Sequence, residues 1–197
     1  FQTDSDCEVI LPLWRERGTD FLNELNGIFA FVALDAETGD WLIARDPMGV
    51  IPLYWGRDEH GALYVSSEMK GLSDVCREFA EFPPGHAWRR GDAAPSRYYE
   101  PTWRPYEATV GKTIEPSVLH DALEAAVERQ LMCDVPYGVL LSGGLDSSLV
   151  AAAAVAHARM RIESGEQEEA WYPRVHSFAI GLEGSPDLAA AQVAADS

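Results

Sequence analysis

The stretch Ser142-Gly143-Gly144-Leu145-Asp146-Ser147-Ser148 decides how the second half of this chain folds. It follows the apolar run Val139-Leu140-Leu141 and precedes an alanine-rich segment from Leu149 to Ala158. An apolar run, a glycine turn and a long alanine-rich segment are typical of a strand, a tight loop and a helix. The sequence therefore predicts an α/β arrangement in which this loop opens a helix.

The residue types in the loop predict a phosphate site. Glycines let the backbone approach an anion closely, and the first turn of a helix presents unpaired N–H groups. Ser142, Ser147 and Ser148 add hydroxyl donors. Asp146 would repel phosphate oxygens unless a divalent cation such as Mg²⁺ lies between them. The predicted ligand is a metal-bound triphosphate or pyrophosphate, and the alternative is a ligand-free turn in which Asp146 or Ser147 caps the helix.

The loop is not a Walker A motif, because it lacks the Gly-Lys-Ser/Thr ending and its lysine. It resembles the S-G-G-x-D-S pyrophosphate loop of the ATP pyrophosphatases. That resemblance implies an enzyme that splits ATP into AMP and pyrophosphate to activate a carboxylate or a base carbonyl. The motif indicates the class of reaction and leaves the substrate open.

Composition limits the class of partner. The chain has 197 residues, of which 47% are hydrophobic, enough for one sizeable core or two small ones. Fifteen basic residues against 32 acidic ones give a net charge of −17, which argues against nucleic acid and against an anionic membrane surface. No apolar run approaches the roughly 18 residues of a membrane span, and the first residues do not resemble a signal peptide. We expect small-molecule substrates and neither insertion nor export.

Cysteine usage predicts a cytoplasmic protein. The three cysteines, Cys7, Cys76 and Cys133, are widely spaced and form neither a Cys-x-x-Cys pair nor a zinc set with the five histidines. A reducing compartment suits such a pattern. We expect all three to be inert buried thiols.

The pattern of residues 1 to 100 predicts an α+β fold. Ser5 to Glu8 has capping-box spacing ahead of an amphipathic helix that ends near Gly18, and a short helix is expected from Asp20 to Leu25. After residue 27 the hydrophobic pattern changes from that of helices to that of strands. Residues 28–34 and 41–44 predict one β-hairpin, and residues 53–55 and 63–65 predict another.

The stretch from Pro101 to Gly111 lacks periodicity and predicts a connector between domains. Beyond it, a helix is expected to open at Pro116, and Val175 to Gly181 predicts a buried strand. Alternating helices and strands imply a parallel sheet, whose ligands bind at the carboxyl ends of the strands, where Ser142 and Ile180 lie. Neither end of the chain carries a start or stop signal, so we expect an interior piece of a longer protein.

At this level of detail the chain resembles the glutamine-hydrolysing asparagine synthetases from end to end. Several independent motifs occur in the same order as in that family. They are Ser5-Asp6-Cys7-Glu8-Val9-Ile10-Leu11, Gly27-Ile28-Phe29-Ala30-Phe31, Arg45-Asp46 with Gly49 and Pro52-Leu53-Tyr54, Ser67-Glu68-Met69-Lys70, Glu81-Phe82-Pro83-Pro84-Gly85, and Asp134-Val135-Pro136-Tyr137-Gly138 leading into the pyrophosphate loop.

The resemblance implies two domains. Residues 1–105 would be the C-terminal part of a class II glutamine amidotransferase domain with an N-terminal-nucleophile fold. Residues 112–197 would be the N-terminal part of a parallel-sheet ATP-pyrophosphatase domain. In that family glutamine supplies ammonia, ATP converts aspartate into β-aspartyl-AMP, and ammonia attacks to give asparagine, AMP and pyrophosphate.

The resemblance also implies roles for single residues. Asp6 matches the aspartate that binds the α-amino group of glutamine, although Asp6 at a helix start would also suit the helix dipole. Asp4, beside it, stands where relatives often carry glycine. The resemblance implies that the remaining matched residues bind ATP and Mg²⁺. Leu140 and Ile180 match adenine-nucleotide contacts, the pyrophosphate is held by Ser142, Gly143, Gly144, Asp146 and Ser147, and Asp146 is the metal ligand.

The family nucleophile is a cysteine at the mature N-terminus, so Cys7 is not that group and the nucleophile is expected upstream of Phe1. With the nucleophile and other site segments outside the sequence, we expect the isolated piece to be inactive. A homodimer is compatible with the sequence but not determined by it. Other conspicuous groups have structural explanations. These are His157 and His176 in packing or surface roles, Arg45 with Asp46 as an ion pair near a turn, and Glu163, Glu166, Glu168 and Glu169 as a solvated loop.

Two other functions remain open at this point. A related ATP-dependent ligase, such as a β-lactam synthetase, keeps the fold and lacks glutamine hydrolysis. A non-catalytic relative would merely bind a nucleotide or a partner. Asp6 and the close match over residues 1 to 100 favour the glutamine-hydrolysing enzyme over both.

Overall fold

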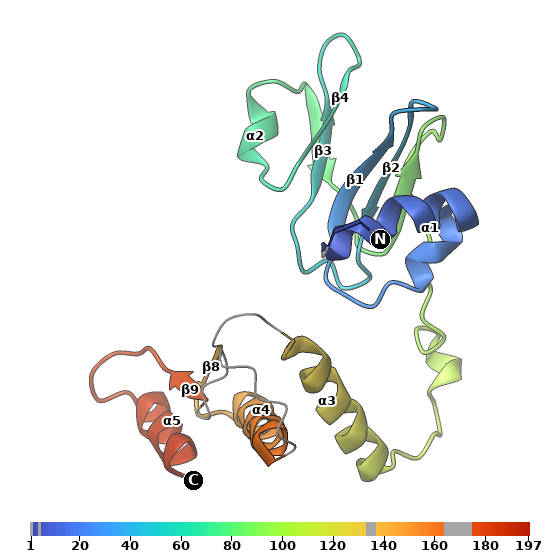
Figure 1. Cartoon of the computed structure of the whole chain (residues 1–197). Coiled ribbons are helices and arrows are strands. Elements are labelled where there is room, and N and C mark those ends of the chain that lie inside the picture. Colours follow the sequence, from blue (N-terminus) through green and yellow to red (C-terminus); the bar gives the residue numbers. More distant parts are fainter. Residues whose placement is uncertain (1, 4, 133–136, 164–174) are drawn as a thin grey trace. The chain divides into compact units, whose positions relative to one another are not determined.

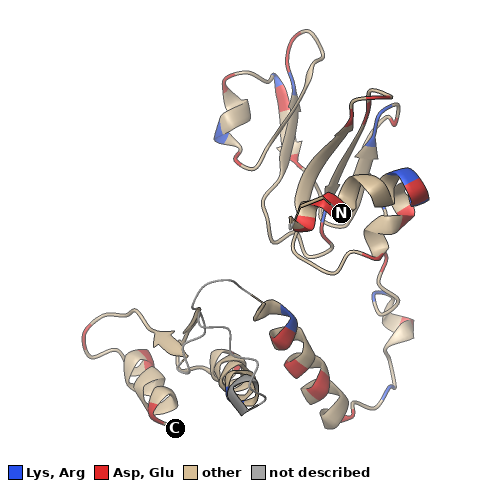
Figure 2. Ribbon diagram, in the orientation of Figure 1, with Lys and Arg blue, Asp and Glu red and all other residues tan. Residues whose placement is uncertain are grey.

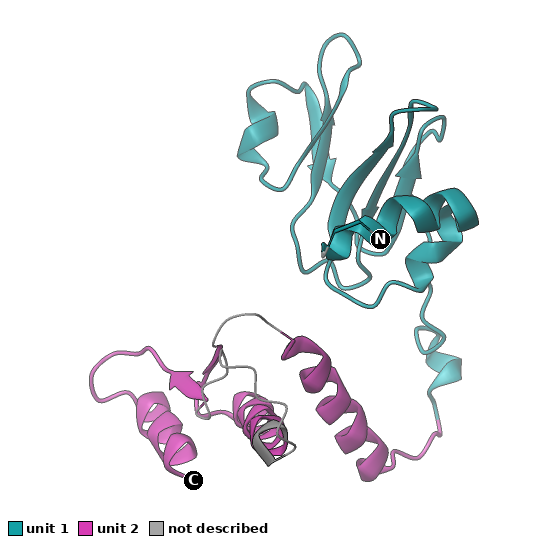
Figure 3. Ribbon diagram, in the orientation of Figure 1, with its two compact units in different colours: residues 1–110 teal, residues 111–197 magenta. Residues whose placement is uncertain are grey.

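A computed structural model of the chain describes every residue except 1, 4, 133–136 and 164–174 (Figure 1). The chain divides into two compact units, Phe1–Val110 and Gly111–Ser197 (Figure 3). Both units combine helices and strands, so the expectation of a mixed α and β protein is confirmed. Among the described residues, no helix is both long and apolar enough to cross a membrane.

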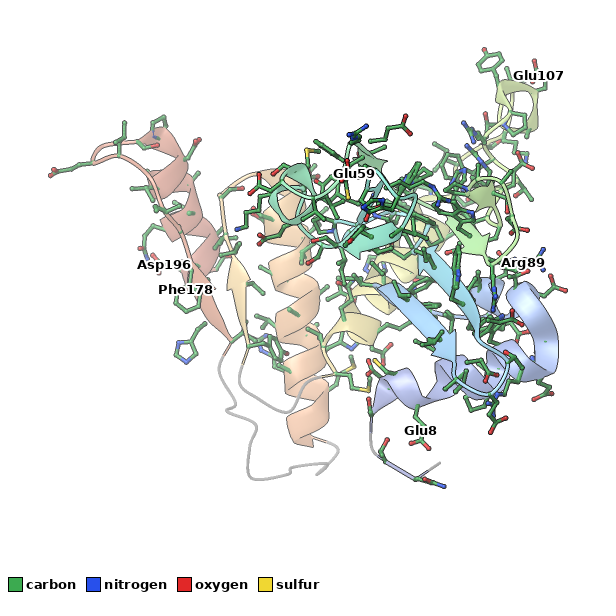
Figure 4. The ribbon with its side chains drawn as sticks, turned by 90° about the horizontal axis from the view of Figure 1, so that it is seen from above. Glu8, Glu59, Arg89, Glu107, Phe178 and Asp196 are labelled. Atoms are coloured by element: carbon green, nitrogen blue, oxygen red, sulfur yellow. The ribbon has the colours of Figure 1, made fainter. Side chains whose placement is uncertain are left out.

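Unit 1 opens with three short helices, the 3-10 helix η1 (Asp6–Val9), α1 (Ile10–Arg17) and the 3-10 helix η2 (Gly18–Asn23). The hydroxyl of Ser5 accepts a hydrogen bond from the N–H of Cys7, as predicted for a helix cap. The predicted capping box is not completed. The carboxylate of Glu8, labelled in Figure 4, instead accepts from the hydroxyl and the N–H of Thr3, at 2.6 and 2.7 Å, and from the N–H of Gln2. These bonds, led by the Thr3 hydroxyl, lower the pKa of Glu8.

The first sheet of unit 1 has four antiparallel strands in the order β1-β2-β6-β7. The strands are β1 (Ala30–Asp35), β2 (Asp40–Arg45), β6 (His86–Arg89) and β7 (Ser96–Arg97). The β1–β2 hairpin confirms the first predicted hairpin. The strands β6 and β7 were not predicted, because they are short and carry no clear alternation.

The second sheet has three antiparallel strands in the order β4-β3-β5. Strands β3 (Tyr54–Arg57) and β4 (Leu63–Ser66) form the second predicted hairpin, and β5 (Glu78–Glu81) pairs with the other side of β3. Two further short helices complete the described elements of unit 1. They are α2 (Lys70–Ser73) and the 3-10 helix η3 (Tyr106–Ala108).

The side chains of β2 alternate between the two faces of the first sheet, which is covered on both sides. On one face, Leu42 and Ala44 pack with Phe21 of η2 and with apolar residues of α1. On the other face, Ile43 and its neighbour Trp88 pack with residues of the second sheet and its flanks. Each such buried side chain contributes about 1.5–3 kcal/mol. Unit 1 is therefore built in three layers: helices, first sheet and second sheet.

A buried arginine ties the loop after β2 to the end of β5. Arg45 is 4% exposed, and its guanidinium donates to the carbonyls of Gly49 and Ile51 at 2.9 Å and of Phe82 at 2.6 Å. Its carboxylate partner is Glu81, at 2.8 Å. The expected ion pair between Arg45 and Asp46 was wrong, because carbonyls and Glu81 take the guanidinium of Arg45 and backbone N–H groups take the carboxylate of Asp46.

Asp46 has a separate role in the same loop. Its carboxylate accepts from the N–H groups of Met48 and Gly49, at 2.9 and 2.8 Å, and from the N–H of Phe29 at 3.3 Å. An aspartate that accepts from the N–H two residues further on is a common way to shape a tight turn. Asp46 is 2% exposed, so these bonds satisfy a buried charge.

Unit 2 has helices α3 (Pro116–Gln130), α4 (Leu145–Glu163) and α5 (Pro186–Asp196), with two strands between them. Strand β8 (Gly138–Leu140) pairs in parallel with β9 (His176–Phe178), which confirms the predicted parallel arrangement of these segments. Val127 of α3 packs with Ala153 and Ala154 of α4 in the described core of the unit. Acidic residues line α3 in Figure 2.

Two expectations about burial were wrong. The strand β9 is not buried, since all three of its residues are exposed and Phe178, labelled in Figure 4, is 60% exposed. Cys7 is exposed, whereas Cys76 is buried as predicted. Cys133 and most of the predicted acidic loop, from residue 164 onward, lie outside the described residues.

Candidate functional site

The loop from Ser142 to Ser147 lies where the sequence predicted it, between the end of β8 and the start of α4. Gly143 has φ of 78°, a left-handed conformation that favours glycine. Leu141, just ahead of the loop, donates its N–H to the carbonyl of Phe178 at 2.8 Å, so the parallel pairing continues to the loop. The loop and the segment after Phe178 therefore leave the same edge of the two-stranded sheet.

The serine hydroxyls of the loop bond within the loop itself. The hydroxyls of Ser142 and Ser147 lie 2.9 Å apart, and Ser147 also donates to the carbonyl of Gly144 at 3.2 Å. Ser148 donates to the same carbonyl at 2.8 Å. These bonds give the loop a defined shape without a ligand. An anion that accepts hydrogen bonds from the serine hydroxyls would replace these internal bonds.

The backbone of the loop is open on one side and packed on the other. A Cβ built on Gly144 would meet only the Ser142 hydroxyl, at 3.5 Å, so an anion can approach the peptide there. A Cβ built on Gly143 would lie 2.5 Å from the nitrogen of Ala191 and 2.7 Å from the Cβ of Ala190, both in α5. This contact could not be predicted from the sequence, because nothing local marks residues 143 and 190 as neighbours.

Asp146 lies in the first turn of α4 with an exposed side chain. Within the described part of the chain its carboxylate has neither a hydrogen-bond nor an ion-pair partner, and no group of three or more His, Cys, Asp or Glu residues could hold a metal ion. A closed protein cage for a metal is thus not formed by these residues. One free carboxylate beside an anion loop does fit Mg²⁺, which is commonly held by one or two carboxylates together with phosphate oxygens.

Leu140 and Ile180 are exposed apolar residues at the ends of the two parallel strands. Leu140 is 83% exposed and Ile180 is 100% exposed, where their residue types alone would place them in a core. Leu145 and Leu182 add further exposed apolar surface to the same two segments, at 75% and 85%. Unit 2 thus combines hydrogen-bond donors, a free carboxylate and apolar side chains in the segments that follow β8 and β9.

Asp6 belongs to unit 1, in η1, and its side chain is exposed. Among the described residues its carboxylate has no hydrogen-bond or ion-pair partner, whereas both oxygens of the nearby Glu8 accept hydrogen bonds, from Gln2 and from Thr3. A free carboxylate next to a fixed one can accept an ammonium ligand. Asp4, whose difference from the family pattern was an expectation from sequence, lies outside the described residues.

The histidines of unit 2 do not take part in the loop. His157 of α4 places Nε2 3.2 Å from a carboxylate oxygen of Glu124 in α3, and its side chain is 12% exposed. His176 is exposed in β9. The expectation that these two histidines have packing or surface roles is therefore confirmed, with His157 packed and His176 at the surface.

Comparison with known proteins defines the class of this chain. Residues 1–99 match the glutamine amidotransferase domain family, and residues 118–197 match the asparagine synthase family. The chain belongs to the glutamine amidotransferase domain family, whose match covers half of its 197 residues.

The relatives narrow the family further. The chain is 53% identical over 196 residues to the glutamine-hydrolysing asparagine synthetase B of Escherichia coli (strain K12), a match that covers all of this chain and 35% of that protein. It is 49% identical to glutamine-hydrolysing asparagine synthetase 2 of Arabidopsis thaliana and 47% identical to a probable glutamine-hydrolysing asparagine synthetase of Dictyostelium discoideum, which it covers to 33% and 36%. The chain thus spans about a third of the length of these relatives, and the predicted resemblance to the glutamine-hydrolysing asparagine synthetases is confirmed.

Proposed function

We propose that the full-length protein makes asparagine, with glutamine as the nitrogen donor and ATP as the energy source. One observation carries this proposal. A glutamine amidotransferase match and an asparagine synthase match follow one another in a single chain, and the second match contains the Ser142 to Ser147 loop at the start of α4. Glutamine hydrolysis would release ammonia, and ATP would activate the β-carboxylate of aspartate as β-aspartyl-AMP. Attack by ammonia then yields asparagine, AMP and pyrophosphate.

The two-part assignment of the chain belongs to this proposal. Residues 1–105 act as part of a class II amidotransferase domain with an N-terminal-nucleophile fold, and residues 112–197 act as the start of an ATP-pyrophosphatase domain. The layered sheets of unit 1 and the parallel strands β8 and β9 of unit 2 are compatible with these two folds. Reduced thiols at Cys7 and Cys76 suit a cytosolic enzyme.

In the proposed ATP site the loop binds the pyrophosphate portion of the nucleotide. The open peptide of Gly144 and the hydroxyls of Ser142 and Ser147 donate to its oxygens, and Gly143 provides the backbone turn. Leu140 and Ile180 contact the adenine nucleotide, and their exposure leaves them available to do so. A carboxylate is a poor electrophile, so adenylylation is needed to provide a good leaving group.

Asp146 is the residue that would hold Mg²⁺ in this proposal. When bound, the cation neutralises the charge that develops on the departing pyrophosphate. The free carboxylate of Asp146 supports this role, because it lies in the first turn of a helix that also presents N–H donors. In unit 1, the free carboxylate of Asp6 binds the α-ammonium of glutamine.

The test is the variant Asp146→Ala in the full-length protein. We expect release of pyrophosphate from ATP and aspartate to fall by at least about 100-fold, because the charge on the leaving group loses its stabilisation. Hydrolysis of glutamine should stay at the wild-type rate. Two coupled assays, for pyrophosphate and for glutamate, measure both activities on one sample.

Asp187→Ala is the matched control, since Asp187 holds the same position in α5 that Asp146 holds in α4. It should leave both activities unchanged. Equal loss of both activities in Asp146→Ala, or loss of neither, would contradict the assignment. Wild-type protein that releases pyrophosphate but never hydrolyses glutamine would instead indicate a β-lactam synthetase-like ligase.

A further inference from the structure

Helix α5 lies directly against the proposed pyrophosphate loop. The peptide of Gly143 approaches α5 so closely that a Cβ at this position would be 2.5 Å from the Ala191 nitrogen and 2.7 Å from the Cβ of Ala190. Real Cβ atoms do not approach other atoms so closely, so only glycine fits here. Ala191 is 3% exposed, which shows that the contact is a packed one.

The same helix also supports the segment after β9. A Cβ built on Gly181 would lie 2.9 Å from Cγ of Leu188 and 3.3 Å from its Cδ1. Gly181 directly follows Ile180, the second predicted nucleotide contact. Leu188 lies two residues before Ala190 in α5. Two segments that are about 40 residues apart in the sequence therefore rest on neighbouring residues of one helix.

We propose that Leu188, Ala190 and Ala191 of α5 are positioning residues for the ATP site, which hold the loop at Gly143 and the segment at Gly181 in a fixed relation. This inference rests on the proposed function of unit 2. The three residues touch no substrate in the proposal and act through the backbone of the two segments. A small side chain is needed at residue 190, because the Cβ of Ala190 lies beside the backbone of the loop at Gly143.

We therefore expect residue 190 to tolerate only small side chains. Ala190 is exposed, so a larger side chain at this position leaves the buried core of unit 2 unchanged. Beside Gly143, however, the added atoms push the loop away from its present position. A displacement of about 1 Å in a group that positions a substrate can reduce catalytic efficiency by up to about 100-fold.

The experiment compares Ala190→Leu with Ala189→Leu in the full-length protein, with ATP as the varied substrate. Ala189 is the preceding exposed residue of α5, so the control makes the same chemical change at equal helix propensity. We expect Ala190→Leu to raise KM for ATP about tenfold with a smaller change in kcat, because binding geometry is altered before chemistry. The conservative variant Ala190→Ser and the control should keep the wild-type KM. Glutamine hydrolysis and the thermal midpoint should stay unchanged in all three.

The outcomes separate this inference from the proposed function. Wild-type protein that binds no ATP, measured by equilibrium dialysis, would overturn both. Wild-type binding with equal KM values for Ala190→Leu and Ala189→Leu would overturn the positioning role alone. If Ala190→Leu fails to fold, KM for ATP is measured in Leu188→Ala instead. This variant removes the side chain that supports Gly181 and adds no atoms. A rise in KM for ATP then supports the role, and an unchanged KM overturns it.

Discussion

The loop after β2 in unit 1 and the Ser142 loop in unit 2 differ in how their polar groups are satisfied. In unit 1 the first sheet is covered on both faces, and Arg45 and Asp46 are buried with their hydrogen bonds satisfied inside the protein. In unit 2 the ends of the two parallel strands are open, and Asp146 is exposed without a partner among the described residues. The difference teaches that a motif rich in charges can be purely structural, whereas a free carboxylate beside an anion loop is available for chemistry.

The covered sheet of unit 1 and the strand ends of unit 2 also differ in the exposure of their apolar side chains. Ile43 and Trp88 in unit 1 are 1% exposed, whereas Leu140 and Phe178 in unit 2 are 83% and 60% exposed. Apolar burial stabilises unit 1 by itself. The exposed side chains of unit 2 gain that stabilisation only when a ligand or further protein covers them.

Arg45→Met provides the strongest test of this contrast. The change leaves three carbonyls and the Glu81 carboxylate without their donor, so unit 1 should lose about 3–5 kcal/mol of unfolding free energy. Urea unfolding followed by tryptophan fluorescence measures it, because five of the six tryptophans lie in unit 1. The control Arg77→Met removes an exposed pair with Glu59 and should cost at most about 1 kcal/mol. Equal losses in the two variants would contradict the structural role of Arg45.

Gly49→Ala tests how tightly the loop after β2 is packed. Gly49 has φ of 65°, and an added Cβ would lie 2.5 Å from Cγ of Pro84 and 3.2 Å from the guanidinium carbon of Arg45. We expect a loss of roughly 2–4 kcal/mol, from backbone strain and from overpacking.

Gly61→Ala is the matched control for this loop. Gly61 has φ of 80° with nothing within 4 Å of an added Cβ, so strain alone should cost about 1–2 kcal/mol. Urea unfolding of both variants gives the difference, which is the packing contribution. A larger loss at Gly61 than at Gly49 would show that the loop is not tightly packed.

Asp35→Asn is expected to have a smaller effect, which is complete above about pH 4 and disappears as the pH falls toward 2. Hydrogen bonds from the Arg15 guanidinium, and then from the N–H of Glu37, lower the pKa of Asp35 to about 2 from its usual 3.8. The folded state keeps this carboxylate ionised where the unfolded chain protonates it. Its contribution to stability is therefore complete above about pH 4 and is lost as the pH falls from about 4 to 2.

The variant should thus flatten the dependence of the unfolding midpoint on pH in this window. Thermal unfolding at pH 2, 3, 4 and 5 measures it. Asp40→Asn, an exposed carboxylate of the same hairpin, should keep the wild-type profile. If Asp35→Asn kept that profile as well, the pairing with Arg15 would not contribute to acid stability.

Expectations that rest on local pattern agree with the structure. The β1–β2 and β3–β4 hairpins, the helix from Pro116 and the strand, loop and helix around Ser142 follow from period and turn chemistry. The expectations that were wrong concern burial and pairing. Cys7 is exposed, β9 is exposed, and Arg45 pairs with Glu81 at a distance of 36 residues along the chain. Residue type alone does not specify which surface another part of the chain covers.

The candidate site divides in the same way. The residues of the loop and Asp146 could be named from sequence. Glycines, hydroxyls and a carboxylate at the start of a helix indicate a phosphate and metal site by their residue types alone. Their roles, and that of Asp6, stay predictions until the two activities are measured. The support of Gly143 and Gly181 by α5 was invisible beforehand, since Ala190 and Leu188 have ordinary helical neighbours.

The sequence by itself determined the local elements and the family to which the chain belongs, and it predicted an anion-binding loop at Ser142. It could do so because backbone conformation and chemical function are largely set by residues within a few positions of each other. Tertiary structure alone decided that Arg45 joins Glu81, that Leu140 and Ile180 are exposed, and that α5 lies against the loop. These depend on contacts between segments that are distant in the sequence, and close packing in three dimensions selects among many equally suitable local patterns.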